Sequence, residues 1–518
     1  MKKNNINWDI EYIYGIMYIV QGGKKLNRIT LEELQRVVPI LAANNVTPND
    51  LFDYFRIVAI NKQKYELDAT NPLYFLSYCT DEEVDRGWFN KKFDLREHVN
   101  KIMKEYPNAT FVIERDMVDE IEEENIKNAK FIVVENIPNT IDLLFEYTKQ
   151  GKKAKVVAVT GSVGKTTTVG LIESVLKTRY NTLRLYSKRI TPIILKASVI
   201  NFLNDDVEYI VLENGIYYHD HVKVLSGLLN PDIACMIDID SCHLGIDKLN
   251  SLDYICAYKA EILRHAKVGI INGEDEYLNK LELCENSVEY NGEPLFPSKL
   301  EKIERIEPSK VELEGDSFII DGNIKVRPFI LSNLAKVQYL TAYNVGVSAG
   351  LTKEEIEKGL NEYTPVENRL NRQVAFGKEV VFDGDITTYE RMKALSDIKY
   401  DSPYLIIRKA GCTERIDRIE DIVDHFDKFK RVFVFDDIEY LEELKNHPNV
   451  EVVSNHDFMQ DLDGVIIYHY SGYYRVWPTF DDNNLKFYDR EVYPILKMTK
   501  EEFKAIEEKK RRLESQGT

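Results

Sequence analysis

Residues 155–168, KVVAVTGSVGKTTT, have the composition and spacing of a phosphate-binding loop. A β-branched run ends at Thr160, a glycine-rich turn follows, and a helical pattern begins at Thr167. Glycines in such a turn let backbone N–H groups face phosphate oxygens, and the helix N-terminus adds partial positive charge. The predicted phosphate contacts are Gly161, Ser162, Val163, Gly164, Lys165, Thr166 and Thr167.

Two residues of the loop have sharper expected roles. We expect Lys165 to reach the β- and γ-phosphates of a nucleotide and Thr166 to bind Mg²⁺ through its hydroxyl. The spacing departs from G-x-x-x-x-G-K-[ST], because Val159 stands where the first glycine is expected. A loop of the ParA/MinD type would need a lysine in place of Thr160. The alternative is a glycine-rich turn with only a structural role, but that interpretation does not explain why Gly-Lys-Thr follows a strand at this spacing.

The composition points to a multidomain protein of a reducing compartment. The length suggests about three domains. With 68 basic and 86 acidic residues, the chain carries a net charge of −18 and no dominant basic patch, so nucleic-acid binding is not indicated. The six cysteines form no C-x-x-C pair, and no apolar run approaches the ~20 residues of a membrane span. We predict a cytoplasmic monomer without membrane insertion.

Alternating strand-like and helical stretches predict an α/β fold of three domains. Between 156 and 272, five strand candidates alternate with helices, which predicts a mostly parallel sheet with ligands at the carboxyl ends of its strands. A β-meander is predicted at 286–330. The predicted divisions are a helical N-terminal extension at 1–70, a small α/β domain at 71–152, the central phosphate-loop domain at 153–364, a Rossmann-like α/β domain at 365–498 and a charged helical tail at 499–518.

Further polar residues follow the loop at predicted strand ends and on one helix. Taken singly, each has a structural interpretation: a carboxylate at a strand end often caps a helix, a lone histidine is often a core residue, and a helical lysine is usually solvated. The residues are Glu213, then Asp238, Asp240 and His243, then Lys259 and Glu261, then Asn272, Glu274 and Asp275.

In this order the stretches resemble the Mur ligase family, whose members show E-x-G, H-L, K-x-E and N-x-x-D after a T-G-S-x-G-K-T-T loop. Here they read ENG from Glu213, HL from His243, KAE from Lys259 and NGED from Asn272. Farther on, Arg369 and the FDG around Asp383 resemble the G-R and D-D-[ST] elements of the family's third domain. The resemblance covers about 71–470, and the loop and the K-x-E stretch are most similar to the MurF type.

The resemblance implies an ATP-dependent ligase that joins a carboxylate acceptor, such as a UDP-linked cell-envelope precursor, to an amino acid or short peptide through an acyl phosphate. The catalytic residues would be Lys165, His243 and Lys259. Mg²⁺ would be held by Thr166, Glu213, His243 and Lys259 in carbamylated form. Asn272 would contact adenine, and Arg369 and Asp383 would reach the nucleotide from the third domain.

The substrate ends depart from the family pattern. No S-R-x-v-x-x-G-d stretch, which helps hold UDP, is recognisable near 70–90, and ITTY at 386–389 replaces N-A-N-P. Two alternatives therefore stay open, namely a polyglutamate- or cyanophycin-type ligase and a non-catalytic nucleotide-binding subunit. No Ser-His-Asp or Cys-His arrangement suggests a protein nucleophile.

Overall fold

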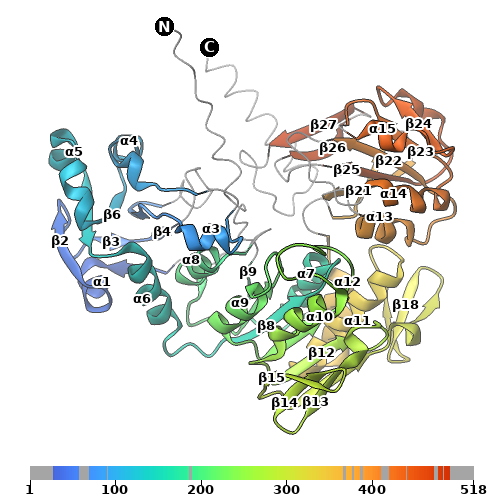
Figure 1. Ribbon diagram of the computed structural model, residues 1–518, viewed down its shortest axis with the longest axis horizontal. Helices are drawn as coiled ribbons and strands as arrows, with labels where there is room; N and C mark the ends of the chain where they lie inside the picture. The colour runs from blue at the N-terminus through green and yellow to red at the C-terminus, as the bar shows by residue number, and fades with distance from the viewer. Residues whose placement is uncertain are drawn as a thin grey trace.

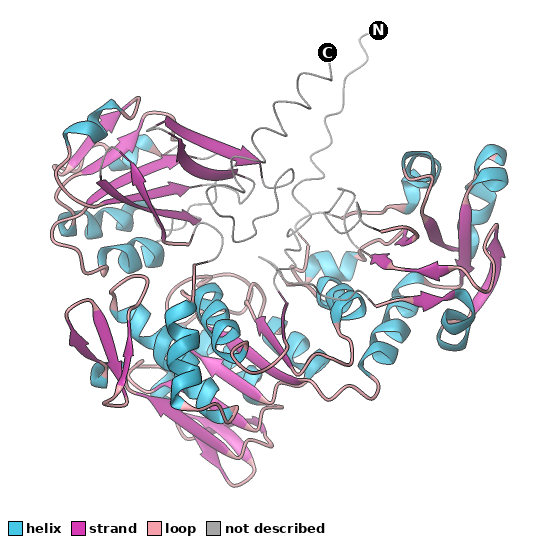
Figure 2. Cartoon of the chain, turned by 180° about the vertical axis from the view of Figure 1, so that it is seen from behind, coloured by secondary structure: helices cyan, strands magenta, loops and turns pink. Residues whose placement is uncertain are grey.

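The computed structural model describes residues 27–57, 69–89, 92–185, 190–365, 369–375, 378–385, 389–409, 419–438, 440–471, 476–481 and 484–489. The predicted tail helix at 499–518 and the segment 386–388 lie outside these residues. Three large sheets, each accompanied by helices, follow one another along the chain (Figure 1, Figure 2). The predicted α/β class and its three domains are confirmed.

The first sheet has the order β2-β7-β6-β5-β4 and is mixed, because only β2 runs antiparallel to its neighbour. A two-stranded ladder of β1 and β3 lies beside it. The strands are β1 Ile29–Thr30, β2 Ile40–Asn44, β3 Leu51–Phe52, β4 Tyr54–Arg56, β5 Pro72–Phe75, β6 Thr110–Glu114 and β7 Lys130–Val134; the helices are α1 Leu31–Val37, α3 Asp81–Asp85, α4 Val99–Glu105, α5 Glu123–Asn128 and α6 Ile137–Lys149.

The prediction of a separate helical extension over 1–70 is wrong for the part that is described. Strands β2 and β4 belong to the same sheet as β5 to β7, so the first domain includes residues from 40 onward. Strand β2 is a half-exposed edge and β4 has three residues, so neither shows the alternation that predicts a strand. A capping box precedes α1, with Thr30 Oγ1 accepting the Glu33 N–H at 3.2 Å.

The central sheet has six parallel strands in the order β16-β12-β11-β8-β10-β9. The five predicted strands are confirmed, and β16 adds a sixth from within the predicted β-meander. The strands are β8 Lys155–Thr160, β9 Thr182–Leu185, β10 Tyr209–Glu213, β11 Ile233–Met236, β12 Val268–Asn272 and β16 Lys302–Ile306; the helices are α7 Lys165–Leu176, α8 Pro192–Phe202, α9 His221–Leu229, α10 Leu252–Ala260, α11 Asn333–Ser348 and α12 Lys353–Glu362.

Two small antiparallel sheets flank β16 in the chain, where the sequence predicted one continuous meander. Each has three strands joined by tight turns. They are β13 Leu281–Cys284, β14 Ser287–Tyr290 and β15 Glu293–Pro297, and then β17 Glu312–Glu314, β18 Ser317–Ile320 and β19 Ile324–Val326.

The C-terminal sheet has the order β20-β21-β25-β22-β23-β24, with β20 antiparallel and the other five strands parallel. Five parallel strands with accompanying helices agree with the Rossmann-like α/β fold that the sequence predicted for this part of the chain. The strands are β20 Asn371–Ala375, β21 Lys378–Asp385, β22 Tyr404–Lys409, β23 Val432–Phe435, β24 Val450–Val453 and β25 Ile466–Ser471, followed by a hairpin of β26 Val476–Asp481 and β27 Asn484–Asp489; the helices are α13 Tyr389–Ser396, α14 Ile419–Ile422 and α15 Leu441–Leu444.

The first and central domains share an apolar core, whereas the core of the C-terminal domain is largely separate. One continuous cluster of buried side chains runs from the first domain through α6 and α8 into the central domain. The C-terminal sheet has two further clusters, one on each side, and the first of them takes in Ile330 from the segment before α11. Within the described residues, no helix is long and apolar enough to cross a membrane.

Candidate nucleotide and metal site

The phosphate loop lies between the end of β8 and the start of α7, as the sequence predicted (Figure 1). Gly164 has φ +88°, a left-handed conformation that glycine adopts without strain, and it precedes the first helical residue. A Cβ on Gly161 would lie 2.4 Å from a side-chain carbon of Ile237. The Lys165 ammonium donates to the carbonyls of Gly161 and Ser162 at 3.0 Å, so this lysine bends back over the loop.

Sheet register brings the predicted Mg²⁺ ligands Thr166 and Glu213 together. Strand β10 runs parallel to β8 with Glu213 beside Val159, so the carboxylate emerges next to the loop. The Thr166 hydroxyl donates to Glu213 Oε2 at 2.8 Å. A hydroxyl and a carboxylate are the hard oxygen ligands that Mg²⁺ prefers, so this pair fits the predicted ion.

Lys259 is fully buried on α10 and points into the loop, where its ammonium donates to Ser162 Oγ at 2.8 Å. Burial and, after it, the positive charge of Lys165 lower the pKa of Lys259 to about 8, although Asp238 partly opposes both. The solvated-lysine interpretation is therefore wrong for Lys259. A buried amine of lowered pKa beside a phosphate loop is chemically reactive.

Asp238 follows β11 and accepts the loop N–H groups of Ser162 and Val163 at 2.6 and 3.0 Å. Burial raises the pKa of Asp238 to about 6, while Lys259 and Lys165 pull it down. The sequence offered Asp238 only as a polar residue at a strand end. The structure makes it the acceptor that shapes the first half of the loop.

His243 and Asn272 lie at the same edge but contact other groups. The His243 ring meets the Tyr217 ring edge-on with centroids 4.8 Å apart, just after the strand that carries Glu213. Asn272 ends β12, donates to the Ile237 carbonyl at 3.2 Å and accepts the Glu274 N–H at 3.1 Å. In the part of the chain that is described, no three His, Cys, Asp or Glu side chains converge as a metal cluster.

A pocket opens between the phosphate loop and the C-terminal domain. Gly164 and Thr167 line one side, and Arg369 and Arg391 line the other. Arg369 also donates to the Gly384 carbonyl at 3.1 Å. Asp383, the other predicted nucleotide contact, is wholly buried behind Arg391 rather than exposed to the pocket.

Gln338 is a neighbour of the loop that sequence reasoning missed. It lies on α11, and its side-chain amide donates to the Gly164 carbonyl at 3.3 Å. A Cβ on Gly164 would approach that amide nitrogen to 2.6 Å, so a side chain at this position would require the Gln338 amide to move. Nothing in the sequence pattern around Gln338 marked it as a neighbour of the loop.

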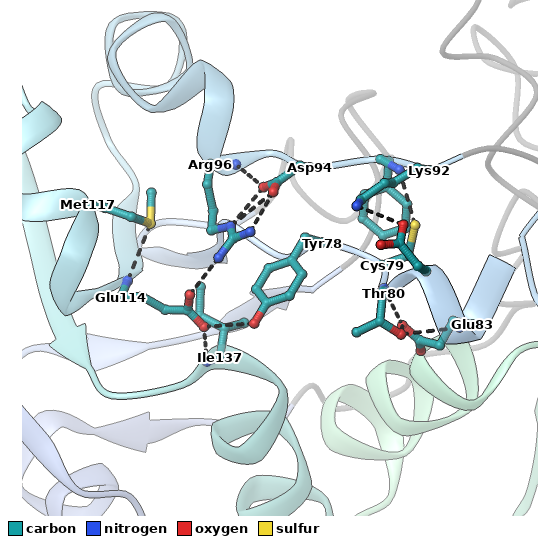
Figure 3. Close-up of polar contacts among 12 residues, drawn as sticks. Tyr78, Cys79, Thr80, Glu83, Lys92, Asp94, Arg96, Glu114, Met117 and Ile137 are labelled. Carbon is teal, nitrogen blue, oxygen red and sulfur yellow. Dashed lines mark hydrogen bonds and ion pairs between the residues drawn. The ribbon is translucent and has the colours of Figure 1, made fainter.

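A second polar cluster lies at the carboxyl end of β6 in the first domain (Figure 3). Arg96 pairs with Asp94 and Glu114 at 2.6 and 2.9 Å and lies over the Tyr78 ring, 3.7 Å from its centroid. Glu114 also accepts the Ile137 N–H at 2.8 Å. Hydrogen bonding to Asp94 is the main cause that raises the pKa of Arg96. Ligands of parallel sheets bind at this edge, but the sequence did not predict the cluster.

The Mur ligase middle domain family matches residues 159–326. This stretch contains all the predicted phosphate contacts from Gly161 to Thr167, together with Glu213, His243, Lys259 and Asn272. The central domain is a Mur ligase middle domain. The predicted resemblance to the Mur ligase family is thereby confirmed.

Curated relatives share this region. The UDP-N-acetylmuramoyl-tripeptide–D-alanyl-D-alanine ligase of Bacillus subtilis is 28% identical over 240 residues, which are 45% of this chain and 50% of that protein. The ligase of the same name from Borreliella burgdorferi is 28% identical over 153 residues, 29% of this chain and 32% of that protein. The chain thus spans half or less of these two relatives.

Solved structures extend the likeness to all three domains. MurF from Acinetobacter baumannii superposes with a TM-score of 0.60 at 15% identity, covering 86% of this chain and 96% of that one. MurF from Thermotoga maritima, solved in complex with ADP, gives 0.57 at 16% identity, with 81% and 94% covered. The Mur ligase middle domain therefore stands in a MurF-like three-domain fold.

Proposed function

We propose that the protein is an ATP-dependent ligase that forms an amide bond between a carboxylate acceptor and an amino acid or short peptide, releasing ADP and phosphate. One observation carries the proposal: Lys165, Thr166, Glu213 and Lys259 all meet at the phosphate loop, on the carboxyl edge of a parallel sheet. This set binds phosphate and a hard cation and contains no protein nucleophile, so the substrate carboxylate takes up the phosphoryl group.

The proposed roles follow from the charges in the reaction. A carboxylate that attacks the γ-phosphate brings two anions together, and Lys165 offsets their repulsion. Thr166 and Glu213, with His243 and carbamylated Lys259, would hold Mg²⁺, which when bound neutralises further phosphate charge. Asn272 would contact adenine and Arg369 the nucleotide. The acyl phosphate that results is then attacked by the amine, and phosphate leaves.

The acceptor is proposed to be a cell-envelope precursor. The names of the curated relatives, all ligases of UDP-N-acetylmuramoyl precursors, support this class. The first domain supplies the acceptor site in this proposal, and the cluster around Arg96 lies at the edge where the site would be. We propose that the reaction takes place in the cytoplasm, where ATP is available.

The decisive experiment measures ADP release with panels of carboxylate acceptors and amines, and traps the intermediate with hydroxylamine. We expect ADP release and hydroxamate to require the carboxylate but not the amine. A polyglutamate-type ligase would respond to glutamyl acceptors instead of envelope precursors. Rapid hydrolysis of ATP alone, without hydroxamate from any carboxylate, would overturn the proposal in favour of an ATPase switch.

Lys165→Ala is the matching variant, with Lys155→Ala at the opposite end of β8 as its control. Loss of a charge that stabilises the transition state costs about 3 kcal/mol or more, so ADP release should fall at least ~100-fold. Equal turnover in the two folded variants contradicts the proposed role. Binding of ATP by the wild type without turnover under any condition would favour the non-catalytic alternative.

Carbamylation of Lys259 has a separate test. The neutral amine reacts with CO₂ to give a carbamate and a proton, and a pKa of about 8 leaves much more neutral amine near pH 8 than an ordinary lysine has. We expect a ¹³C carbamate signal in labelled bicarbonate that grows from pH 6.5 to 8. It should vanish in Lys259→Ala, and short carboxylates should restore part of that variant's activity. A signal that persists in the variant assigns the carbamate elsewhere.

A further inference from the structure

The pocket between the phosphate loop and the C-terminal domain has an unusual charge distribution. Of its described lining residues, only Arg369 and Arg391 are charged, and no acidic side chain lines it. The remaining lining is neutral and largely apolar, including Phe329, Leu334 and Tyr339. Arg369 and Arg391 place positive charge on the side of this small pocket, about 40 Å³, that lies across from the phosphate loop, which suits a phosphate group bound between the two sides.

Arg391 is held in place by a buried carboxylate. Its Nε donates to Asp383 Oδ2 at 2.7 Å, and its Nη2 pairs with the other oxygen of the same carboxylate. Asp383 Oδ2 also lies 3.2 Å from His469 Nδ1, and both of these residues are fully buried. Strand register sets this arrangement, because β21 and β25 run parallel with Asp383 directly beside His469.

The exposure of the pair indicates which partner meets a ligand. The Asp383 side chain is 0% exposed, whereas that of Arg391 is 12% exposed and lines the pocket. A salt bridge that served only the core would bury both partners. The carboxylate binds one edge of the guanidinium and thereby fixes its orientation, as pre-organised arginines in phosphate sites require.

We propose that Arg391 is a phosphate-binding residue of the nucleotide site, and that Asp383 and His469 position its guanidinium instead of touching the nucleotide themselves. The inference rests on the proposed ATP site. In this proposal Asp383 does not contact the nucleotide directly, because both oxygens of its carboxylate bind the Arg391 guanidinium. A nucleotide phosphate held between the loop and Arg391 joins two domains, so binding favours their closed arrangement.

The test compares ADP with adenosine, which lacks phosphates, in calorimetric binding to the full chain. Arg391→Gln should weaken ADP binding at least about tenfold, because a charge-assisted contact to phosphate is lost, and change adenosine binding less than about twofold. Arg391→Lys, which keeps the charge but not the fork, should lie between. The control is Arg431→Gln, an exposed arginine of the same domain that pairs with Glu451.

Asp383→Asn tests the positioning role. It should weaken ADP binding less than Arg391→Gln, and it should add little when combined with that variant. Equal losses for ADP and adenosine, or unchanged ADP binding in a folded Arg391→Gln or Arg391→Lys protein, overturn the inference. Lys165→Ala distinguishes failure of the proposed ATP site from failure of the proposed role of Arg391. If Lys165→Ala also leaves ADP binding unchanged, the proposed ATP site is wrong. If Lys165→Ala weakens ADP binding and Arg391→Gln does not, only the role of Arg391 is wrong.

Discussion

The first and C-terminal domains are attached to the central domain in different ways, and in Figure 1 they stand on opposite sides of it. The first domain shares a continuous apolar core with the central domain. The C-terminal domain has separate cores, one of which takes in only Ile330 and Phe329 from the central domain, and it also meets that domain through polar contacts of α13. Since apolar burial is costly to undo and exposed ion pairs are not, we expect the first two domains to move as one body.

The first interface is built from buried side chains. Trp88 stacks on His221 with centroids 3.7 Å apart, and both are almost fully buried. On the other side of this contact, His221 Nδ1 accepts the Tyr217 N–H at 3.3 Å, so Nε2 carries the proton and donates to the Arg86 carbonyl at 2.8 Å. Because Tyr217 also touches His243, the first domain is tied to the candidate site.

The second interface includes two polar contacts of α13, one from the buried Glu390 and one from the exposed Lys393. Glu390 accepts a hydrogen bond from the Ser241 hydroxyl, and the Lys393 ammonium lies 2.7 Å from Asp240 Oδ2. Both central-domain partners belong to the loop between β11 and His243. From this difference we expect that any closure over a bound nucleotide is a movement of the C-terminal domain, with the first and central domains as the fixed part.

Trp88→Ala should have the largest effect. Removing a buried tryptophan costs about 3–5 kcal/mol, and here the loss falls on the shared core. We expect the first and central domains to unfold together at lower denaturant, with the C-terminal domain unaffected. Trp88→Phe should keep most of the stability. Separate transitions for the first and central domains in the wild type would contradict the shared-core description.

Asn201→Ala is the polar counterpart at the same interface. The buried Asn201 amide accepts the Phe55 N–H and donates to the Phe55 carbonyl, each at 2.9 Å, so it pairs with the first domain as a strand would. Leaving these buried groups unpaired costs about 1–3 kcal/mol. Calorimetry should show a smaller loss than for Trp88→Ala. The exposed Asn446→Ala serves as the control, and an equal loss there would remove the special role of Asn201.

Glu390→Gln weakens the second interface without touching the phosphate loop. Exchanging a charge-assisted hydrogen bond to Ser241 for a neutral one makes opening easier by ~1 kcal/mol, with little change in global stability. We expect less amide per ADP, because an open site admits water to the acyl phosphate. The ratio is measured in one assay of both products, with the exposed Glu442→Gln as control. An unchanged ratio would argue that closure does not depend on this contact.

Much of this arrangement follows from local patterns, and some of it does not. The phosphate loop and the ends of β10 and β12 are predicted because β-branched runs, glycines and strand-end polar residues are adjacent in sequence. Strands β2 and β4 escape prediction, because an exposed edge strand and a three-residue strand depend on neighbours more than on their own pattern.

The residues of the candidate site also divide into those that local sequence patterns predict and those that they do not. Lys165, Thr166, Glu213 and Lys259 meet as predicted, since parallel strands deliver their carboxyl ends to one edge. The pairing of Arg391 with Asp383 joins α13 to the interior of β21, and no spacing in the sequence marks that contact. The sequence therefore found Asp383 but assigned it the task that the structure favours for its partner.

Lys393→Gln should have the smallest effect of these variants, and it tests most directly whether the second interface depends on an exposed ion pair. Partial burial lowers the pKa of Lys393, but the hydrogen bond and charge of Asp240 outweigh it, so the pKa is raised. A raised lysine pKa means that the pair stabilises the protein below the unfolded value near 10.5 and is lost only as pH rises above it. Between pH 6 and 9, salt rather than pH is thus the useful variable. The side chain is 56% exposed, so the pair contributes about 0.2–1 kcal/mol.

The expected behaviour is specific to the second interface. At low salt, Lys393→Gln should lower the amide-to-ADP ratio slightly. In the wild type, salt should produce the same decrease, and in the variant salt should add little, because the screened interaction is already absent. The comparison variant is Lys430→Gln, which removes an exposed ion pair with Asp463 in the same domain, far from the loop. If that variant responds to salt as Lys393→Gln does, the effect is one of net charge, and the docking of α13 is not held by Asp240.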